Sequence, residues 1–289
     1  MDDIQYGVRE LKPADMKKVA ELVRSAPPLE TVFLRPIARD LAGFEGWWQG
    51  ALEGGKHLVT AMAIKDHVAH LYSSSHAATS AMANALKKQQ EILKGVVQPA
   101  RHQLIGEADT VDTFWRTFGS LYGRTLVSDK RRPLMVSSTT PEASPSKRVK
   151  LGYAPMSDLK VVIEFRGEYQ LERDGTDPRR LTPQAHAARC QQLMAEKRVV
   201  IGRDEDKPIC VAELVELDEA TILLDGFWIP PAFRGRKRLI GGALHLTRKA
   251  PQAKGKEVIY FADDEAGVAA GELAGFEQKT EYRFITSFG

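Results

Sequence analysis

The hydrophobic pattern at the start of the chain changes from the alternation of a strand to the spacing of a helix. The segment IQYGVREL alternates, and KPADMKKVAELVRSAPP follows it. In that second segment the apolar residues recur at helical spacing: Met16, Val19, Ala20 and Val23. Pro13 stands where a first helical turn tolerates proline, and Pro27 ends the element. A strand followed by a helix is therefore predicted.

The rest of residues 1–138 continues the same mixture of periods. HLVTAMAI and HVAHLYSS are two strand patterns joined by Lys65 and Asp66, which is the spacing of a hairpin. The Gly- and Trp-rich segment 43–55 predicts a loop. Further helices are predicted at 78–95 and 109–123, and further strands at 102–107 and 134–138. We expect a mixed α/β domain here.

Residues 139–150 (TTPEASPSKRVK) lose the apolar period and gather proline, serine, threonine and charge, which predicts a linker. The basic string PSKRVKL also resembles a nuclear import signal, although such short strings arise often by chance and the linker interpretation is favoured. A second domain, 151–289, follows. Its predicted helices are 157–174, one beginning after Thr182-Pro183, 238–250 and 264–274, and its predicted strands are 198–202, 208–217, 221–229 and 256–261.

Composition narrows the class of protein. The chain has 289 residues, 43% hydrophobic and 27% charged, which suits two globular domains that each bury a core. A formal net charge of only +3 makes a nucleic-acid partner unlikely. No apolar run approaches the roughly 20 residues that cross a bilayer. Cys190 and Cys210 have no metal-ligating neighbours at suitable spacing, so we expect two buried apolar thiols, no metal site and a cytoplasmic protein.

One stretch carries candidate chemistry: WIPPAFRGRKRLIGGAL, residues 228–244, in which a strand meets a basic, glycine-containing turn and then a helix. The first N–H groups of a helix lack partners and lie at the positive end of its dipole. A turn rich in arginine and glycine at that point suits a pyrophosphate. A solvated basic loop explains the same pattern, so both interpretations stay open from the residues alone.

Several segments of the chain are similar to those of a known protein family. VELDEATILLDGFWIPPAFRGRKRLIGGAL, followed by GKEVIYFADDEAGVAAGELAGFEQKTEYRF, resembles the GNAT superfamily of acyl-CoA-dependent N-acyltransferases, in its two-domain bacterial branch. VRELKPADMKKVAELV is similar to a GNAT opening. The resemblance implies tandem domains of class α/β (α+β mixed sheet), each a twisted mixed sheet with helices on both faces, and acetyl-CoA or another acyl-CoA as ligand. It implies backbone contacts to pantetheine at Phe227, Trp228 and Ile229, and pyrophosphate contacts at Arg234, Gly235, Arg236, Lys237, Arg238 and Gly241.

The sequence departs from the family pattern in two places. One glycine of the family's Arg/Gln-x-x-Gly-x-Gly motif is replaced, by Lys237 or by Leu239 depending on where the motif begins. Counted back from Gly275-Phe276, the family's asparagine falls on Asp264, and its tyrosine, the usual general acid, falls on Gly271. Water or Tyr260 are the substitutes that we expect. The candidate bases are Glu213, Glu216 and Asp225, with Glu213 as first choice, although a structural role is the commoner one for a strand carboxylate. His186 and His245 receive no role.

These observations favour transfer of an acyl group to an amine of a small molecule or a protein. The alternative is a catalytically inactive scaffold that binds a protein partner, with or without CoA. A third, weaker interpretation is an anionic-polymer binder that uses 234–249 and 147–150. Residues 1–138 contain no Arg-x-x-Gly-x-Gly string, so we expect a degenerate copy that serves as a lid or substrate platform. A homodimer stays possible.

Overall fold

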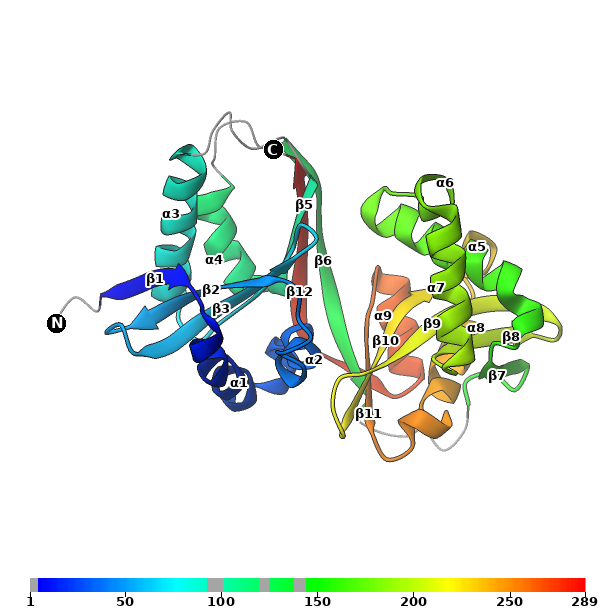
Figure 1. Ribbon diagram of the computed structural model, residues 1–289. Coiled ribbons are helices and arrows are strands. Elements are labelled where there is room, and N and C mark those ends of the chain that lie inside the picture. Colours follow the sequence, from blue (N-terminus) through cyan, green and yellow to red (C-terminus); the bar gives the residue numbers. More distant parts are fainter. Residues whose placement is uncertain (1–4, 93–100, 120–124, 138–143, 289) are drawn as a thin grey trace. The chain divides into compact units, whose positions relative to one another are not determined.

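The computed structural model describes residues 5–92, 101–119, 125–137 and 144–288 (Figure 1). The chain forms two compact units. Unit 1 comprises residues 1–132 together with 280–289, and unit 2 comprises residues 133–279. The units therefore differ from the two contiguous halves that we predicted, because the last ten residues belong to the first unit.

Unit 1 is built on a mixed sheet. Its strands follow the order β1 (Tyr6–Glu10), β2 (Trp47–Glu53), β3 (His57–Lys65), β4 (Val68–Ser73), β5 (Arg101–Glu107) and the second part of β12 (Phe276–Phe288). All neighbours are antiparallel except β4 and β5, which are parallel. The parallel step requires a crossover, and α3 supplies it.

Helices cover both faces of this sheet (Figure 1). On one face α1 (Met16–Ser25) and α2 (Leu34–Arg39) pack in an apolar cluster with Trp48 and Leu52 of β2. On the other face α3 (His76–Ile92) and α4 (Ala108–Phe118) pack with Ala51 and Met62. The alternation of the strands thus divides their side chains between two cores.

Unit 2 repeats the arrangement. Its strand order is β7 (Val149–Tyr153), β8 (Val199–Asp204), β9 (Lys207–Glu216), β10 (Thr221–Trp228), β11 (Glu257–Phe261) and the last residues of β6 (Thr125–Ser137). Of the described pairings in this unit, that of β10 with β11 is parallel and the others are antiparallel. In each unit the sixth strand is out of chain order: β12, from the end of the chain, in unit 1, and the last residues of β6 in unit 2. The first residues of β6, 125–132, belong to unit 1.

The helices of unit 2 also lie on both faces of its sheet. The cluster that contains Val162 and Leu193 joins α5 (Leu159–Asp174) and α7 (Pro183–Ala195) to β8, β9 and Trp228. The short α6 (Pro178–Leu181) contacts both of these helices. The opposite cluster, around Leu244 and Ala270, joins α8 (Lys237–Thr247) and α9 (Glu265–Leu273) to the sheet. The predicted α/β class and the tandem mixed sheets are confirmed.

Three strands were not predicted. Segment 43–55, expected to be a loop, contains β2, in which residues 48–52 are all buried, so no alternation marks it. Gly50 lies there because a Cβ atom would meet the side chains of Leu11 and Leu58. Strand β7 begins inside the predicted linker, and β12 follows the last predicted helix. Residues 139–143 of the linker, residue 138 at the end of a predicted strand, and the ends of two predicted helices, 93–95 and 120–123, lie outside the described residues.

Within the described residues, no helix has the length and apolar character needed to cross a membrane. Cys190 and Cys210 are free and buried, as expected.

Candidate functional site

Strand β10 loses one of its two neighbours before it ends. Its parallel pairing with β11 runs from Thr221 opposite Glu257 to Leu224 opposite Tyr260, and it stops there. Residues 225–228, which we call the parted end of β10, pair only with β9 among the described strands. Backbone polar groups on the former β11 side are therefore available to another hydrogen-bonding partner.

A β-bulge accompanies the parting of the strands. Asp225 pairs with Glu213 and Trp228 pairs with Val211, so Gly226 and Phe227 oppose a single residue of β9. Gly226 has a φ of +61°, a conformation that favours glycine. The extra residue changes the face of the sheet to which the following side chains point. Leu224 belongs to the α8/α9 cluster, whereas Trp228, four residues later, belongs to the α5/α7 cluster on the other face. Phe227 consequently packs on the α8/α9 side.

The chain then enters the basic turn, residues 229–238. Pro230 and Pro231 begin it, and a short 3-10 helix, Pro231–Phe233, leads to α8. Within the described part of the chain, the backbone N–H groups of Gly235, Lys237 and Arg238 donate to no backbone carbonyl. A Cβ atom at Gly235 would meet nothing within 4 Å, so the protein itself imposes no need for glycine there.

The cations of the basic turn fall into two groups. Arg234 is engaged: its Nη2 lies 2.6 and 2.7 Å from the two carboxylate oxygens of Glu172, and its Nε donates to the Ile229 carbonyl at 2.9 Å. Arg236, Lys237 and Arg238 are exposed, and none of them forms an ion pair with a residue that the structure describes. The Arg236 guanidinium lies 5.2 Å from the centre of the Phe233 ring. Three exposed cations thus lie at the start of α8, the same stretch whose backbone N–H groups lack carbonyl acceptors in the described chain.

Gly241 and the residues near it serve helix packing. A Cβ atom at Gly241 would lie 2.9 Å from the carbonyl oxygen of Ala270, so this glycine allows α8 and α9 to approach closely. Leu239 packs against a cluster that includes Val149 and Ala243, and Lys237 is the exposed first residue of α8. The predicted contact of Gly241 with pyrophosphate therefore has a competing structural explanation.

Tyr260 is enclosed in the core of unit 2. It is 1% exposed, and its hydroxyl donates to the Gly267 carbonyl at 2.8 Å. Burial, with a smaller contribution from Glu272, raises the pKa of Tyr260 above its usual range. Gly271, where the family has tyrosine, sits against this hydroxyl. Asp264, in the family's asparagine position, caps α9 by accepting from the Gly267 N–H at 2.7 Å.

The predicted bases occupy different environments. Glu213 is 4% exposed and bound by arginines: Arg166 lies 2.9 Å from one carboxylate oxygen, and Arg198 contacts the other. Asp225 lies opposite Glu213 on β10, at the first residue of the parted end, and forms no ion pair within the described chain. Glu216 pairs with Lys256 at 3.1 Å. The arginines around Glu213 offset the repulsion of two carboxylates on facing residues.

Both histidines that received no role are packing residues. His186 is buried, and its Nε2 lies 3.0 Å from the Ile163 carbonyl. His245 is fully buried on α8. Within the described residues, no cluster of three or more His, Cys, Asp or Glu side chains is arranged to hold a metal ion.

Strand β4 of unit 1, the counterpart of β10, also loses its parallel partner early, because its pairing with β5 stops at Leu71 opposite Gly106. It has no bulge, however, since it pairs with β3 in unbroken register from Lys65 opposite Val68 to Thr60 opposite Ser73. The segment after it, SSHAATSA, carries neither arginine nor lysine. Unit 1 has another feature that no sequence motif indicated, a cavity of about 570 Å³ with aromatic walls. Its lining comes from distant segments, so no short motif could mark it.

Comparisons with known proteins agree with this architecture. No protein-family model and no curated protein matches the sequence. Among solved structures, a GCN5-related N-acetyltransferase from Sphaerobacter thermophilus superposes with a TM-score of 0.62 at 13% identity, over 97% of this chain and 95% of that one. A GNAT-family acetyltransferase from Colwellia psychrerythraea gives 0.57 at 14% identity over 98% of each chain.

A tandem GNAT protein from the clavulanic acid biosynthesis pathway gives a TM-score of 0.56 at 11% identity, again over 98% of each chain. The likeness extends over nearly the whole of both chains and includes both units. At these identities the likeness shows the fold alone, which this chain shares with these three structures.

Proposed function

We propose that unit 2 binds an acyl-CoA, with acetyl-CoA as the first candidate, and that the protein is an N-acyltransferase acting on an amine. The observation that carries this proposal is the parted end of β10 beside the basic turn. Unpaired strand backbone, open space at Gly235 and three exposed cations at a helix N-terminus lie consecutively along residues 225–238. Solved structures with the same fold include acetyltransferases, which supports the same conclusion.

The residues present fit such a ligand from one end to the other. The amide groups of the pantetheine arm find backbone partners along 225–229, as an added strand would. The pyrophosphate finds the N–H groups of Gly235, Lys237 and Arg238 together with the charges of residues 236–238. Arg234 contacts Glu172 and Ile229 and so shapes the turn, and we therefore assign the main pyrophosphate contacts to residues 235–238.

The thioester of the bound ligand supplies an acyl carbon to which the amine nitrogen bonds as the carbon–sulfur bond breaks. The chain has to hold the amine next to that carbon and to accept a proton from the amine nitrogen. Asp225 is the base that we propose, because it lies at the parted end and its carboxylate is not held in an ion pair within the described chain. Glu213, the first choice from sequence, is occupied by Arg166 and Arg198. Water, rather than the enclosed Tyr260 hydroxyl, is the proton donor to the departing thiolate.

A second function is favoured by one observation: no side chain replaces the family tyrosine at Gly271, and the nearest phenol donates to a backbone carbonyl. In this alternative unit 2 binds CoA or acyl-CoA without turnover, and the protein is a scaffold for a protein partner. Binding and turnover are therefore measured separately.

Calorimetric titration of the whole protein with acetyl-CoA and CoA tests the binding step. The triple variant Arg236→Ala, Lys237→Ala, Arg238→Ala should weaken both ligands by about 100-fold, because each of these exposed charges contributes on the order of 1 kcal/mol and about 1.4 kcal/mol is a factor of ten. The control is Lys160→Ala, Lys207→Ala, Lys254→Ala, which removes three exposed lysines of the same unit and the same total charge. Equal losses in the two variants, or no binding at millimolar ligand, would contradict the proposal.

Turnover is then followed as free thiol released from acetyl-CoA in the presence of a panel of amines. Thiol release that depends on an added amine supports the transferase. Tight binding with no release for any amine supports the scaffold.

A further inference from the structure

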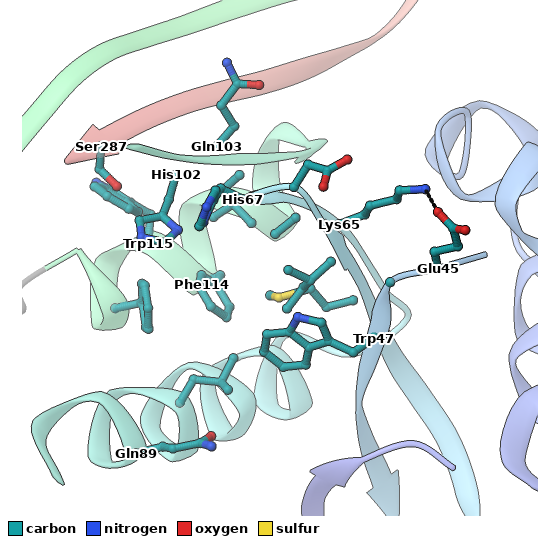
Figure 2. Close-up of a pocket in the computed structure, with 18 residues that line it drawn as sticks. Glu45, Trp47, Lys65, His67, Gln89, His102, Gln103, Phe114, Trp115 and Ser287 are labelled. Carbon is teal, nitrogen blue, oxygen red and sulfur yellow. Dashed lines mark hydrogen bonds and ion pairs between the residues drawn. The ribbon is translucent and has the colours of Figure 1, made fainter. Parts of the chain in front are cut away.

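The cavity of unit 1 lies at the end of the sheet away from the helix N-termini. It is formed where β3 ends and where β4 and β5 begin, beside the last turns of α3 and α4 (Figure 2). The site proposed in unit 2 lies at the opposite end of the corresponding strands, past the carboxyl end of the β10–β11 pairing. The cavity is therefore a separate site with no counterpart in the acyl-carrier arrangement.

The walls of this cavity are apolar and largely aromatic. Its volume of about 570 Å³ lies in the range of small-molecule pockets, about 300–1,000 Å³. Trp47 is 46% exposed although it is a tryptophan in a strand, and its indole forms one wall. The other apolar wall residues are Met62, Ile64, Leu86, Leu104, Phe114, Trp115 and Phe118. Such walls favour a ligand with an apolar body.

Polar side chains line several parts of the cavity: His67, His102, Gln103 and Ser287 come from the sheet and its turn, and Gln89 comes from α3 on the other side (Figure 2). His67 and His102 lie next to each other, with ring centroids 5.1 Å apart and planes at 82° (Figure 2). Lys65 and Glu45 are also in the lining but bind one another at 3.3 Å, so their charges cancel. The Asp66 carboxylate and the His67 ring belong to the same exposed turn. The adjacent imidazoles of His67 and His102 carry N–H groups that can donate to a ligand in the cavity.

The turn that carries His67 is strained. Asp66 and His67 have φ values of +49° and +66°, so both central residues of the β3–β4 hairpin are left-handed. Aspartate suits the first position of such a turn, but the second favours glycine, and a histidine there costs on the order of 1–2 kcal/mol. The strain holds a histidine beside His102 at the cavity, where glycine would leave no side chain.

We propose that this cavity binds a small molecule with an apolar chain or ring and a single carboxylate. The apolar body fills the space between Trp47 and Phe114, and the carboxylate accepts hydrogen bonds from His67 and His102. An amine would find two imidazoles where it needs an anion as its partner. A phosphate would lack the helix N-terminus that such a group favours. The inference does not depend on acyl transfer in unit 2.

Three probes with the same eight-carbon chain test the proposal: octanoate, octanol and octylamine, titrated into the whole protein by calorimetry. We expect octanoate to bind at least about tenfold more tightly than the other two, because hydrogen bonds to a charged group are worth roughly 1.5–3 kcal/mol. Octanol binding as tightly as octanoate, octylamine binding more tightly, or no octanoate binding at millimolar concentration would each overturn the proposal.

Two variants separate the apolar body from the head group. Trp47→Ala should weaken octanoate and octanol by a similar factor, since it removes wall area from both. His67→Leu with His102→Leu should weaken octanoate by about tenfold or more and leave octanol unchanged. The matched control is His57→Leu, an exposed histidine at the other end of β3. Loss of the preference for octanoate in that control, or its survival in the double variant, would contradict the assignment of the two imidazoles.

Discussion

The hydroxyl oxygen of Tyr260 fills the space that a Cβ atom at Gly271 would need. The phenol comes from β11 and the glycine from α9, and the hydroxyl donates to the carbonyl of Gly267 one turn earlier on that helix. The absence of a side chain at 271 and the presence of the buried phenol are therefore one packing arrangement. The phenol thereby occupies the space beside position 271, where the family pattern has a tyrosine on this helix.

Gly271→Ala should destabilise unit 2 unless the phenol is shortened as well. Overpacking costs about 1–3 kcal/mol, which the better helix propensity of alanine offsets by up to about 1 kcal/mol. Tyr260→Phe alone should cost about 1 kcal/mol through the lost hydrogen bond. In the double variant the clash with the oxygen disappears, so its loss should be smaller than the sum of the two single losses. Free energies of unfolding from denaturant titrations of all four proteins measure this coupling.

Gly235→Val should leave stability unchanged and weaken acyl-CoA. Its Cβ would meet no protein atom within 4 Å, so the fold has room for the side chain. A ligand whose phosphates approach the backbone N–H groups has none, and we expect an affinity loss of tenfold or more, about 1.4 kcal/mol. Gly152→Val is the control, since a Cβ at this exposed glycine of β7 also meets nothing within 4 Å. Equal affinities in the two variants would count against phosphate binding at the turn.

Much of the fold follows from the sequence because the amphipathic elements bury only one face. Helices α1 and α4 show their period in the apolar residues alone. Strand β2 does not, because both of its faces are covered, by α1 on one side and α3 on the other. The sequence also does not predict which sheets β6 and β12 join, since the local hydrophobic pattern of a strand does not specify its neighbours.

The candidate site, like the fold, is only partly predictable from the sequence. The basic turn and the glycine-containing start of α8 are contiguous in sequence and could be predicted. The states of Glu213 and Arg234 could not, since each is decided by a partner on α5, Arg166 and Glu172 respectively. The cavity of unit 1 depends on a turn, two strands and two helices meeting, and no local signal encodes that meeting.

Glu213 and Asp225 should respond to substitution in opposite ways. Glu213→Gln leaves two buried or half-buried arginines without their anion, so we expect a stability loss of about 3–5 kcal/mol. Asp225→Asn removes no ion pair of the described chain, so stability should hold while kcat falls by about 10²–10⁴ if Asp225 is the base. Thermal midpoints and amine-dependent thiol release distinguish them. A stable but inactive Glu213→Gln protein would restore Glu213 as the base.

Stability should fall as the pH drops below 6.5, because of His70. Its ring stacks on Phe33 at 5.2 Å, and burial lowers the pKa of His70 to about 4. The unfolded chain therefore takes up this proton near pH 6.5, whereas the folded protein stays neutral until about pH 4, so stability is lost progressively over that window, by at most about 3 kcal/mol. His70→Phe removes the group and should flatten this part of the pH profile of unfolding free energy, whereas replacement of the exposed His57 by leucine should not. An unchanged slope in His70→Phe would show that another group causes the acid sensitivity.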